Sequence, residues 1–234
     1  EALKKAVEYN KKLLGNVVLT DPFDPEAVEK QNEDYDNILN IAGDGVMGAV
    51  EIPSIDVYLP IYHGTDSKSL EKGAGHLENS SFPEGGKGTH SIISAHTGLP
   101  SAKMFDNLTE VKEGDIFYIH VLNRTLAYEV NQIKVVLPEN ISDLLINKNR
   151  DYVTLITCTP YGINSHRLLV RGERIPYREA KKKDKSESKT NNMWKAYALV
   201  GVLAVVLIIL LWYYYRIRPK KKKARKKQVR RNEK

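Results

Sequence analysis

The sequence is poor in cysteine, with Cys158 as the only one among 234 residues. A lone thiol excludes a disulfide within the chain, and it excludes the zinc sites that need several cysteines. The histidines show no zinc-type spacing either; they are His63, His76, His90, His96, His120 and His166. We therefore expect no metal and no other cofactor. Cys158 itself is an inert core residue, an intermolecular link or a nucleophile.

Basic charge is scarce outside one end of the chain. The formal net charge is +7, but residues 216–234 hold twelve Lys and Arg against one Glu. The preceding residues contain 24 basic and 28 acidic side chains, so their net charge is about −4. This distribution argues against a basic patch on a folded face, and nucleic acid is not an expected partner.

Charge is absent from residues 196–215, a run of 20 residues with the length that a helix needs to cross a bilayer core of ~30 Å. Trp194 precedes the run, and Trp212 and its neighbours end it, as aromatic residues do at a membrane interface. A buried core helix is the alternative, but ordinary chain rather than a polybasic tail would follow it. We expect a single-pass transmembrane helix in the cell membrane.

The basic tail also sets the expected orientation. The positive-inside rule places residues 216–234 in the cytoplasm and the domain before Ala196 outside the cell. The chain starts with Glu1 rather than Met, so we expect that an upstream export signal has been removed. Secreted domains that use cysteine structurally tend to carry it in even numbers. One unpaired cysteine therefore suggests chemistry, or an envelope without a disulfide-forming system.

The apolar pattern predicts helices at the N-terminus. Residues 2–14 suit an amphipathic helix. Asp24 is suited to cap a second helix that runs to about Asn40. Residues 1–47 would thus form a helical N-terminal region with a separate segment at about 20–25.

Residues 48–176 show mainly strand and turn signals, which predict a mainly β domain that forms a closed barrel or a sandwich. We expect one short helix over 142–149. The charged residues 177–195 predict a flexible stalk before the membrane. The expected strands cover residues 50–52, 56–62, 91–95, 115–121 and 125–137 and the segments around Cys158 and Arg167.

Cys158 stands at the end of one of these strands. Residues 152–157 read as a buried strand, and Pro160 stops it, so Cys158 lies where the strand opens into a loop. Arg167 begins the next apolar run nine residues later. Across a turn, this spacing returns Arg167 to the side of Cys158.

A histidine partner is expected for the thiol, because a thiol with the ordinary pKa of about 8.5 needs a cationic neighbour to be a good nucleophile near neutral pH. His96 ends a short apolar strand and is the best candidate. We expect His76 and His90 in glycine-rich loops. His166 should alternate to the face opposite Arg167.

Three separate segments resemble the sortase family. Thr154-Leu-Ile-Thr-Cys158 resembles the family signature TLxTC. The segments that begin at Ser94 and His166 match the family's histidine and arginine motifs in order and spacing. The resemblance implies an eight-stranded barrel over about Gly48 to Arg174.

Class C sortases, which assemble pili, show a closer resemblance. It rests on the stretch between Cys158 and Arg167, on the C-terminal anchor and on Asp21-Pro22-Phe23, which is similar to the lid motif Asp-Pro-aromatic. Taken alone, these three residues read more simply as a turn followed by a helix cap. As a lid, Asp21 would pair with Arg167, and Phe23 would cover Cys158.

The resemblance also implies a role for each site residue in a cysteine transpeptidase. Cys158 would be the nucleophile that forms a thioester, and His96 would be the general acid and base. Arg167 would stabilise the oxyanion or position the substrate, and Thr157 would support either of these tasks.

The implied substrates are pilin subunits with an LPxTG-like sorting signal. The acyl group would pass to the amine of a pilin lysine and form an isopeptide bond. Three alternatives remain: a housekeeping sortase that attaches proteins to cell-wall precursor, a hydrolytic cysteine peptidase, and a membrane-tethered adhesin in which Cys158 is inert. The lid motif and the C-terminal anchor favour class C over the housekeeping type.

Overall fold

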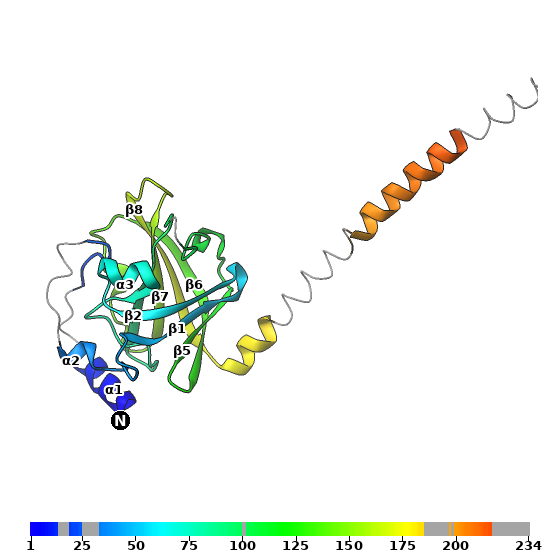
Figure 1. Ribbon diagram of the computed structural model, residues 1–234. Helices are drawn as coiled ribbons and strands as arrows, with labels where there is room; N and C mark the ends of the chain where they lie inside the picture. The colour runs from blue at the N-terminus through cyan, green and yellow to red at the C-terminus, as the bar shows by residue number, and fades with distance from the viewer. Residues whose placement is uncertain (14–18, 25–32, 100–101, 185–196, 198, 217–234) are drawn as a thin grey trace, which may run out of the picture. The chain divides into compact units, whose positions relative to one another are not determined.

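The computed structural model describes residues 1–13, 19–24, 33–99, 102–184, 197 and 199–216. The chain divides into two compact units, Glu1–Lys183 and Asp184–Lys234. The first unit contains a β-barrel with short helices around it (Figure 1).

Eight strands close into the barrel in the order β1-β2-β3-β4-β7-β8-β6-β5. The pairs β2·β3 and β4·β7 are parallel, and the other neighbouring pairs are antiparallel. This architecture confirms the expected mainly β barrel. The strands are β1 (Val46–Ile52), β2 (Val57–His63), β3 (Ala74–His76), β4 (Thr89–Ser94), β5 (Ile116–Val121), β6 (Arg124–Val136), β7 (Asp151–Thr159) and β8 (His166–Ile175). The helices are α1 (Ala2–Lys12), α2 (Glu33–Asp36) and α3 (Ser67–Lys72), with 3-10 turns η1 (Pro53–Ile55), η2 (Leu108–Glu110) and η3 (Ser142–Leu144).

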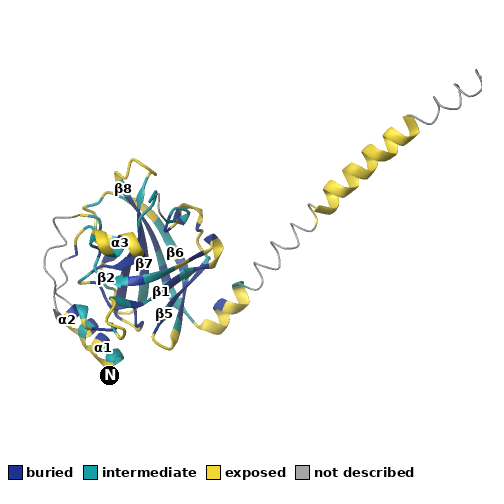
Figure 2. Ribbon diagram, viewed as in Figure 1, coloured by how far each residue is buried: buried dark blue, intermediate teal, exposed yellow. Residues whose placement is uncertain are grey.

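Strand β7 divides its side chains between two faces. Val153 and Leu155 belong to the main core cluster, whereas Ile156 belongs to a second cluster on the other face of the sheet. Successive side chains of a strand point to opposite faces. Thr157 therefore shares the face of the main core, and Cys158 shares the face of Ile156. The strands are largely buried (Figure 2).

The N-terminal region is fastened to the barrel at two places. In α1, the buried Asn10 side chain donates to the carbonyl of Phe82 at 3.1 Å and accepts its N–H at 2.7 Å. At α2, the buried Tyr35 hydroxyl lies 2.9 Å from Nδ1 of His76. Residues 19–24 lie between these two anchors in the sequence, so the barrel holds the segment from both sides.

The two predicted N-terminal helices fare differently. The first prediction is confirmed by α1, which spans Ala2–Lys12. Of the second helix, the structure describes only α2, a single turn of four residues at Glu33–Asp36. Residues 25–32 lie outside the described part of the chain.

The short helix predicted over residues 142–149 was wrong in its extent, because η3 covers only Ser142–Leu144. Asparagine side chains cause the difference. The Asn140 side chain accepts the backbone N–H of Ser142 at 3.2 Å, and the Asn147 side chain accepts that of Asn149 at 3.0 Å. Such local bonds offer the backbone an alternative to helix hydrogen bonds.

The placement of His76 and His90 in loops was also wrong. His76 ends β3 and His90 lies in β4, and both are buried. His90 Nε2 lies 2.7 Å from the Thr154 hydroxyl. Gly75 serves close backbone packing within β3, since a Cβ on it would lie 2.3 Å from the carbonyl oxygen of Gly64. Gly85, Gly86 and Gly88 do form a loop with positive φ, but β4 begins directly after it at Thr89.

The first part of the predicted stalk is folded. Residues 177–184 are helical, and Ala180 is fully buried against Tyr118 and two further apolar residues of β5 and β6. The Lys183 ammonium lies 2.5 Å from the carboxylate of Glu129. The flexible stalk is therefore wrong for these residues, because their apolar side packs on the barrel. Residues 185–195 of the predicted stalk lie outside the described residues.

The second unit contains one described helix, Leu199–Arg216. Its 18 residues are long and apolar enough to cross a membrane, and its side chains are exposed (Figure 2). It coincides with most of the transmembrane segment predicted over 196–215. Residues 217–234 of the basic tail lie outside the described residues.

Candidate active site

Cys158 and Arg167 lie directly opposite each other in the antiparallel pair β7·β8. The predicted return of Arg167 to the side of Cys158 is thus confirmed. Cys158 is half-buried, and Arg167 is buried with only 9% of its surface exposed. Strand pairing fixes this contact, because a one-residue slip of either strand would turn the side chain on that strand to the opposite face.

His96 reaches the same place from strand β4. The parallel ladder between β4 and β7 ends with the pair Ser94–Ile156, and the Ala95 N–H still donates to the Ile156 carbonyl at 3.1 Å. His96 and Cys158 each come two residues after this last pair. Both therefore stand at the same end of the barrel and on the same face.

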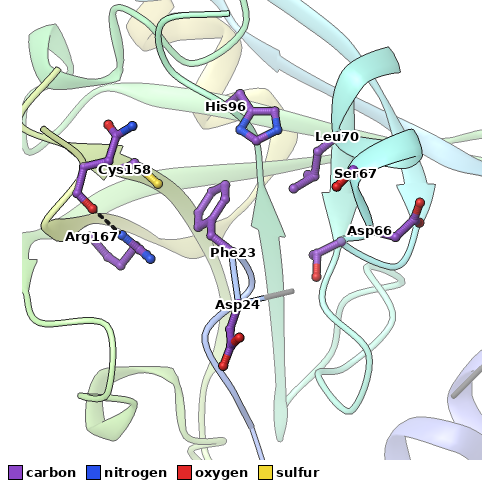
Figure 3. A pocket seen from close by; sticks show the side chains of 10 residues that line it. Phe23, Asp24, Asp66, Ser67, Leu70, His96, Cys158 and Arg167 are labelled. Carbon is purple, nitrogen blue, oxygen red and sulfur yellow. Dashed lines mark hydrogen bonds between the residues drawn. The ribbon is translucent and has the colours of Figure 1, made fainter. Parts of the chain in front are cut away.

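These side chains line one pocket of about 470 Å³. Figure 3 shows Cys158 and Arg167 on one side and His96 on the other. The pocket is completed by Phe23, Asp24, Thr65, Asp66, Ser67, Leu70 and Asn164. The wall formed by α3 was not predicted from the sequence. Asp66 caps this helix, since its carboxylate accepts the N–H of Lys68 at 2.9 Å.

The segment Asp21–Phe23 fills the space between the site residues. Asp21 accepts two hydrogen bonds from the Arg167 guanidinium, at 2.8 and 2.5 Å, and only 11% of either side chain is exposed. The Phe23 ring lies 5.2 Å from the guanidinium carbon and 5.9 Å from the imidazole ring of His96. Pro22 lines the small crevice beside this ion pair. The segment thus pairs with the guanidinium of Arg167 and forms part of the pocket wall.

The closed site keeps the thiol protonated. Burial raises the pKa of Cys158, the charge of Arg167 lowers it, and the charge of Asp21 raises it again, with a net upward shift. Burial lowers the pKa of His96, against a smaller upward effect of Glu71. Both shifts favour the neutral forms of the thiol and the imidazole, which suits a resting rather than a reactive state.

Thr157 does not meet the pocket as expected. Its side chain is buried, and its hydroxyl donates to the carbonyl of Ala95 at 2.8 Å. Among the described residues that line the pocket, Thr157 is absent. The hydroxyl is turned away from the place where a substrate would lie, because it shares the face of the barrel core rather than that of Cys158.

Comparison with known proteins agrees with this geometry. Residues 50–175 match the sortase domain. Sortase C-1 from Streptococcus pneumoniae is 53% identical with a TM-score of 0.70, and the match covers 75% of this chain and 89% of that chain. A pilus-related sortase C of group B Streptococcus is 45% identical with a TM-score of 0.69, over 76% of this chain and 89% of that chain.

Sortase D of Bacillus subtilis (strain 168) is 29% identical over 131 residues, or 55% of this chain. The match spans 63% of the length of that relative. The sortase domain match covers more than half of the chain, and it includes both β4 and the β7–β8 pair that carry the site. The chain therefore belongs to the sortase family of cysteine transpeptidases, and its structural neighbours are class C sortases.

Proposed function

We propose that the chain is a cysteine transpeptidase in which Cys158, His96 and Arg167 are the catalytic residues. The observation that carries this proposal is the pairing of the thiol with a buried guanidinium across β7·β8, with an imidazole in the same pocket. A fixed cation beside a thiol suits the stabilisation of negative charge on a tetrahedral intermediate.

The reaction proceeds in two acyl transfers. His96 takes the thiol proton, and the sulfur of Cys158 attacks the carbonyl carbon of the scissile peptide bond. Arg167 donates to the oxygen that becomes negative. The imidazolium then gives its proton to the leaving amine, and a thioester remains. A primary amine attacks this thioester and loses a proton to His96, and the sulfur leaves.

Asp21, Pro22 and Phe23 act as a lid on this reaction. The lid must move before the reaction starts, because Asp21 holds the guanidinium and Phe23 lines the pocket between Cys158 and His96. Burial of the Phe23 ring is worth ~1.5–3 kcal/mol if it is complete. When the lid opens, Asp21 and Arg167 are both hydrated again, so breaking their ion pair has a modest net free-energy cost. The lid therefore opens often enough for substrate to enter.

The substrates are pilin subunits. One subunit supplies an LPxTG-like sorting signal that is cleaved between Thr and Gly, and another supplies a lysine amine. The support comes from the class C neighbours, one of which is described as a pilus-related sortase C. The lid segment favours this assignment over a housekeeping sortase.

The enzyme is anchored in the cell membrane by the helix Leu199–Arg216, which is long and apolar enough to span it. The twelve basic residues of segment 216–234 place that end in the cytoplasm. The barrel then lies outside the cell, where pilin subunits are assembled.

The proposal is tested by mixing the enzyme with candidate pilin subunits and following ladders that resist SDS. Wild type should form ladders, and Cys158→Ala should form none while keeping its circular dichroism spectrum. A model sorting peptide with an added amine separates the alternatives. An amine adduct supports a transpeptidase, and release of the free acid alone supports a hydrolytic peptidase.

A further inference from the structure

His96 stands on a part of the chain that has already left the sheet. The parallel ladder ends at Ser94, and the Ala95 N–H makes the last bond to β7. From His96 onward, no strand pairing is described for the chain until Ile116. Something other than the sheet must therefore hold the imidazole in place.

The Thr157 hydroxyl holds the peptide group that leads into His96. It lies 2.8 Å from the carbonyl oxygen of Ala95, and this carbonyl is bonded to the nitrogen of His96. A carbonyl only accepts, so the hydroxyl must donate its one proton here. That proton is then not available for an oxyanion. Thr157 also precedes Cys158 directly, so one residue links the thiol strand to the histidine backbone.

Two further hydrogen bonds hold the chain that follows His96. The Asp106 carboxylate accepts the backbone N–H of Gly98 at 2.6 Å, and the N–H of Phe105 donates to the His96 carbonyl at 3.0 Å. Gly98 has φ +79°, a turn conformation that side chains disfavour. The two bonds close the loop back onto His96, so its backbone is held on both sides.

We propose that Thr157 and Asp106 are positioning residues that fix the imidazole of His96 relative to Cys158 through the backbone. Neither side chain belongs to the pocket that the described residues form. The inference rests on the proposed role of His96 as acid and base. A misplacement of a catalytic group by ~1 Å costs on the order of 10²-fold in rate.

Matched variants separate this role from direct contact with substrate. Thr157→Val removes the donor at similar size, and Thr157→Ser restores it. Asp106→Ala removes the acceptor, and Asp106→Asn keeps one. The full chain is assayed with a fluorogenic LPxTG-type peptide and hydroxylamine as the amine. Thr157→Val and Asp106→Ala should lower kcat about 10- to 100-fold with KM changed less than about twofold. Thr157→Ser and Asp106→Asn should recover most of the rate.

Folding is checked on the same samples. The circular dichroism spectrum should match wild type, and the thermal midpoint should stay above the assay temperature, although the lost hydrogen bond lowers it by a few degrees. Wild-type kcat in Thr157→Val and Asp106→Ala would overturn the inference. So would a raised KM at unchanged kcat in Thr157→Val, which marks contact with the substrate, or a failure of Thr157→Ser to restore the rate.

His96→Ala separates this inference from the proposed function. If His96→Ala retains wild-type rates, the acid–base assignment fails, and the positioning role fails with it. If His96→Ala is inactive but Thr157→Val and Asp106→Ala are fully active, only the positioning role is overturned.

Discussion

At the scale of single residues, the protonation of the Cys158 thiol depends on whether the Arg167 guanidinium is paired with Asp21. Arg167 alone would favour the thiolate of Cys158, but Asp21 takes two of its N–H bonds and adds a negative charge nearby. Cys158 and Arg167 can therefore form an inactive or an active pair. The lid sets which of these two states is present, since Asp21 supplies the carboxylate that competes for Arg167.

Removal of the lid carboxylate should activate the thiol. In Asp21→Ala, the pKa of Cys158 should fall, because one cause of its upward shift is gone while Arg167 stays. The measurement is the rate of alkylation against pH. Its midpoint should move to lower pH than in wild type, and an unmoved midpoint would mean that Asp21 does not control the thiol.

Phe23 should act by cover rather than by charge. Phe23→Ala should raise the alkylation rate of Cys158 at every pH, and the midpoint should fall only as far as the reduced burial of the thiol allows. The double variant of Asp21 and Phe23 should show both effects with nearly the thermal midpoint of wild type. Wild-type alkylation in the double variant would reduce the segment to a turn.

At the scale of elements, the N-terminal region depends on few but well-buried contacts. Helix α1 has only Ala6 and Asn10 fully buried, one turn apart on one face. Asn10 accepts the buried N–H of Phe82, and it donates to the Phe82 carbonyl, which also accepts the N–H of Glu84 at 2.8 Å. The anchor of the lid segment is therefore polar and specific rather than apolar.

Asn10→Ala should lower the free energy of unfolding by about 1–3 kcal/mol, because it leaves the buried N–H of Phe82 unpaired, while the Phe82 carbonyl keeps the N–H of Glu84. Denaturation in urea measures this change. Lys11→Ala, at an exposed position of the same helix, is the matched control and should change little. Equal stability of both variants would show that α1 is not anchored through Asn10.

The contact of Cys158 with Arg167 could be predicted from the sequence, because two strands and one turn fix which residues face each other. The end of an apolar strand likewise identified His96. The direction of the Thr157 hydroxyl could not be predicted, since it depends on which face of β7 meets the core. The burial of His76 could not be predicted, because Gly75 within β3 looks like a loop residue in a sequence. The burial of His90 could not be predicted either, because β4 begins directly after a glycine-rich loop.

At the scale of the whole molecule, two buried histidines tie stability to pH. Burial lowers the pKa of His76 to about 3 and that of His90 to about 4 from an ordinary 6.5. The unfolded chain binds these protons at higher pH than the folded chain does. The contribution of the two neutral histidines to the free energy of unfolding is therefore fully present above about pH 6.5, and it is lost as pH falls toward 4.

The variant His90→Gln should reduce the loss of stability at acidic pH. For His90 the expected loss is on the order of 3 kcal/mol between pH 6.5 and 4, since one pKa unit is worth about 1.4 kcal/mol. Urea denaturation at several pH values gives the slope. His166→Gln, at a partly exposed position, is the control and should keep the wild-type slope. A wild-type slope in His90→Gln would contradict the assignment.

The barrel unit should fold without the C-terminal helix, provided that residues 177–184 are kept. A chain that ends at Asp184 retains the burial of Ala180 and the Lys183–Glu129 ion pair. A chain that ends at Pro176 loses both and exposes Tyr118. Its free energy of unfolding should be lower by about 1–3 kcal/mol. Equal unfolding midpoints for the two chains would show that the short helix contributes nothing.

The central claim is that Cys158 carries the acyl group between two substrates. The most direct test is the intact mass of the enzyme, with the lid opened by Asp21→Ala and Phe23→Ala, after mixing with an LPxTG-type peptide. The account predicts an added mass equal to the peptide up to its threonine, located on Cys158 and transferred to an added amine. The added mass should be absent in Cys158→Ala. Peptide cleavage and amine transfer that persist in Cys158→Ala would contradict the account.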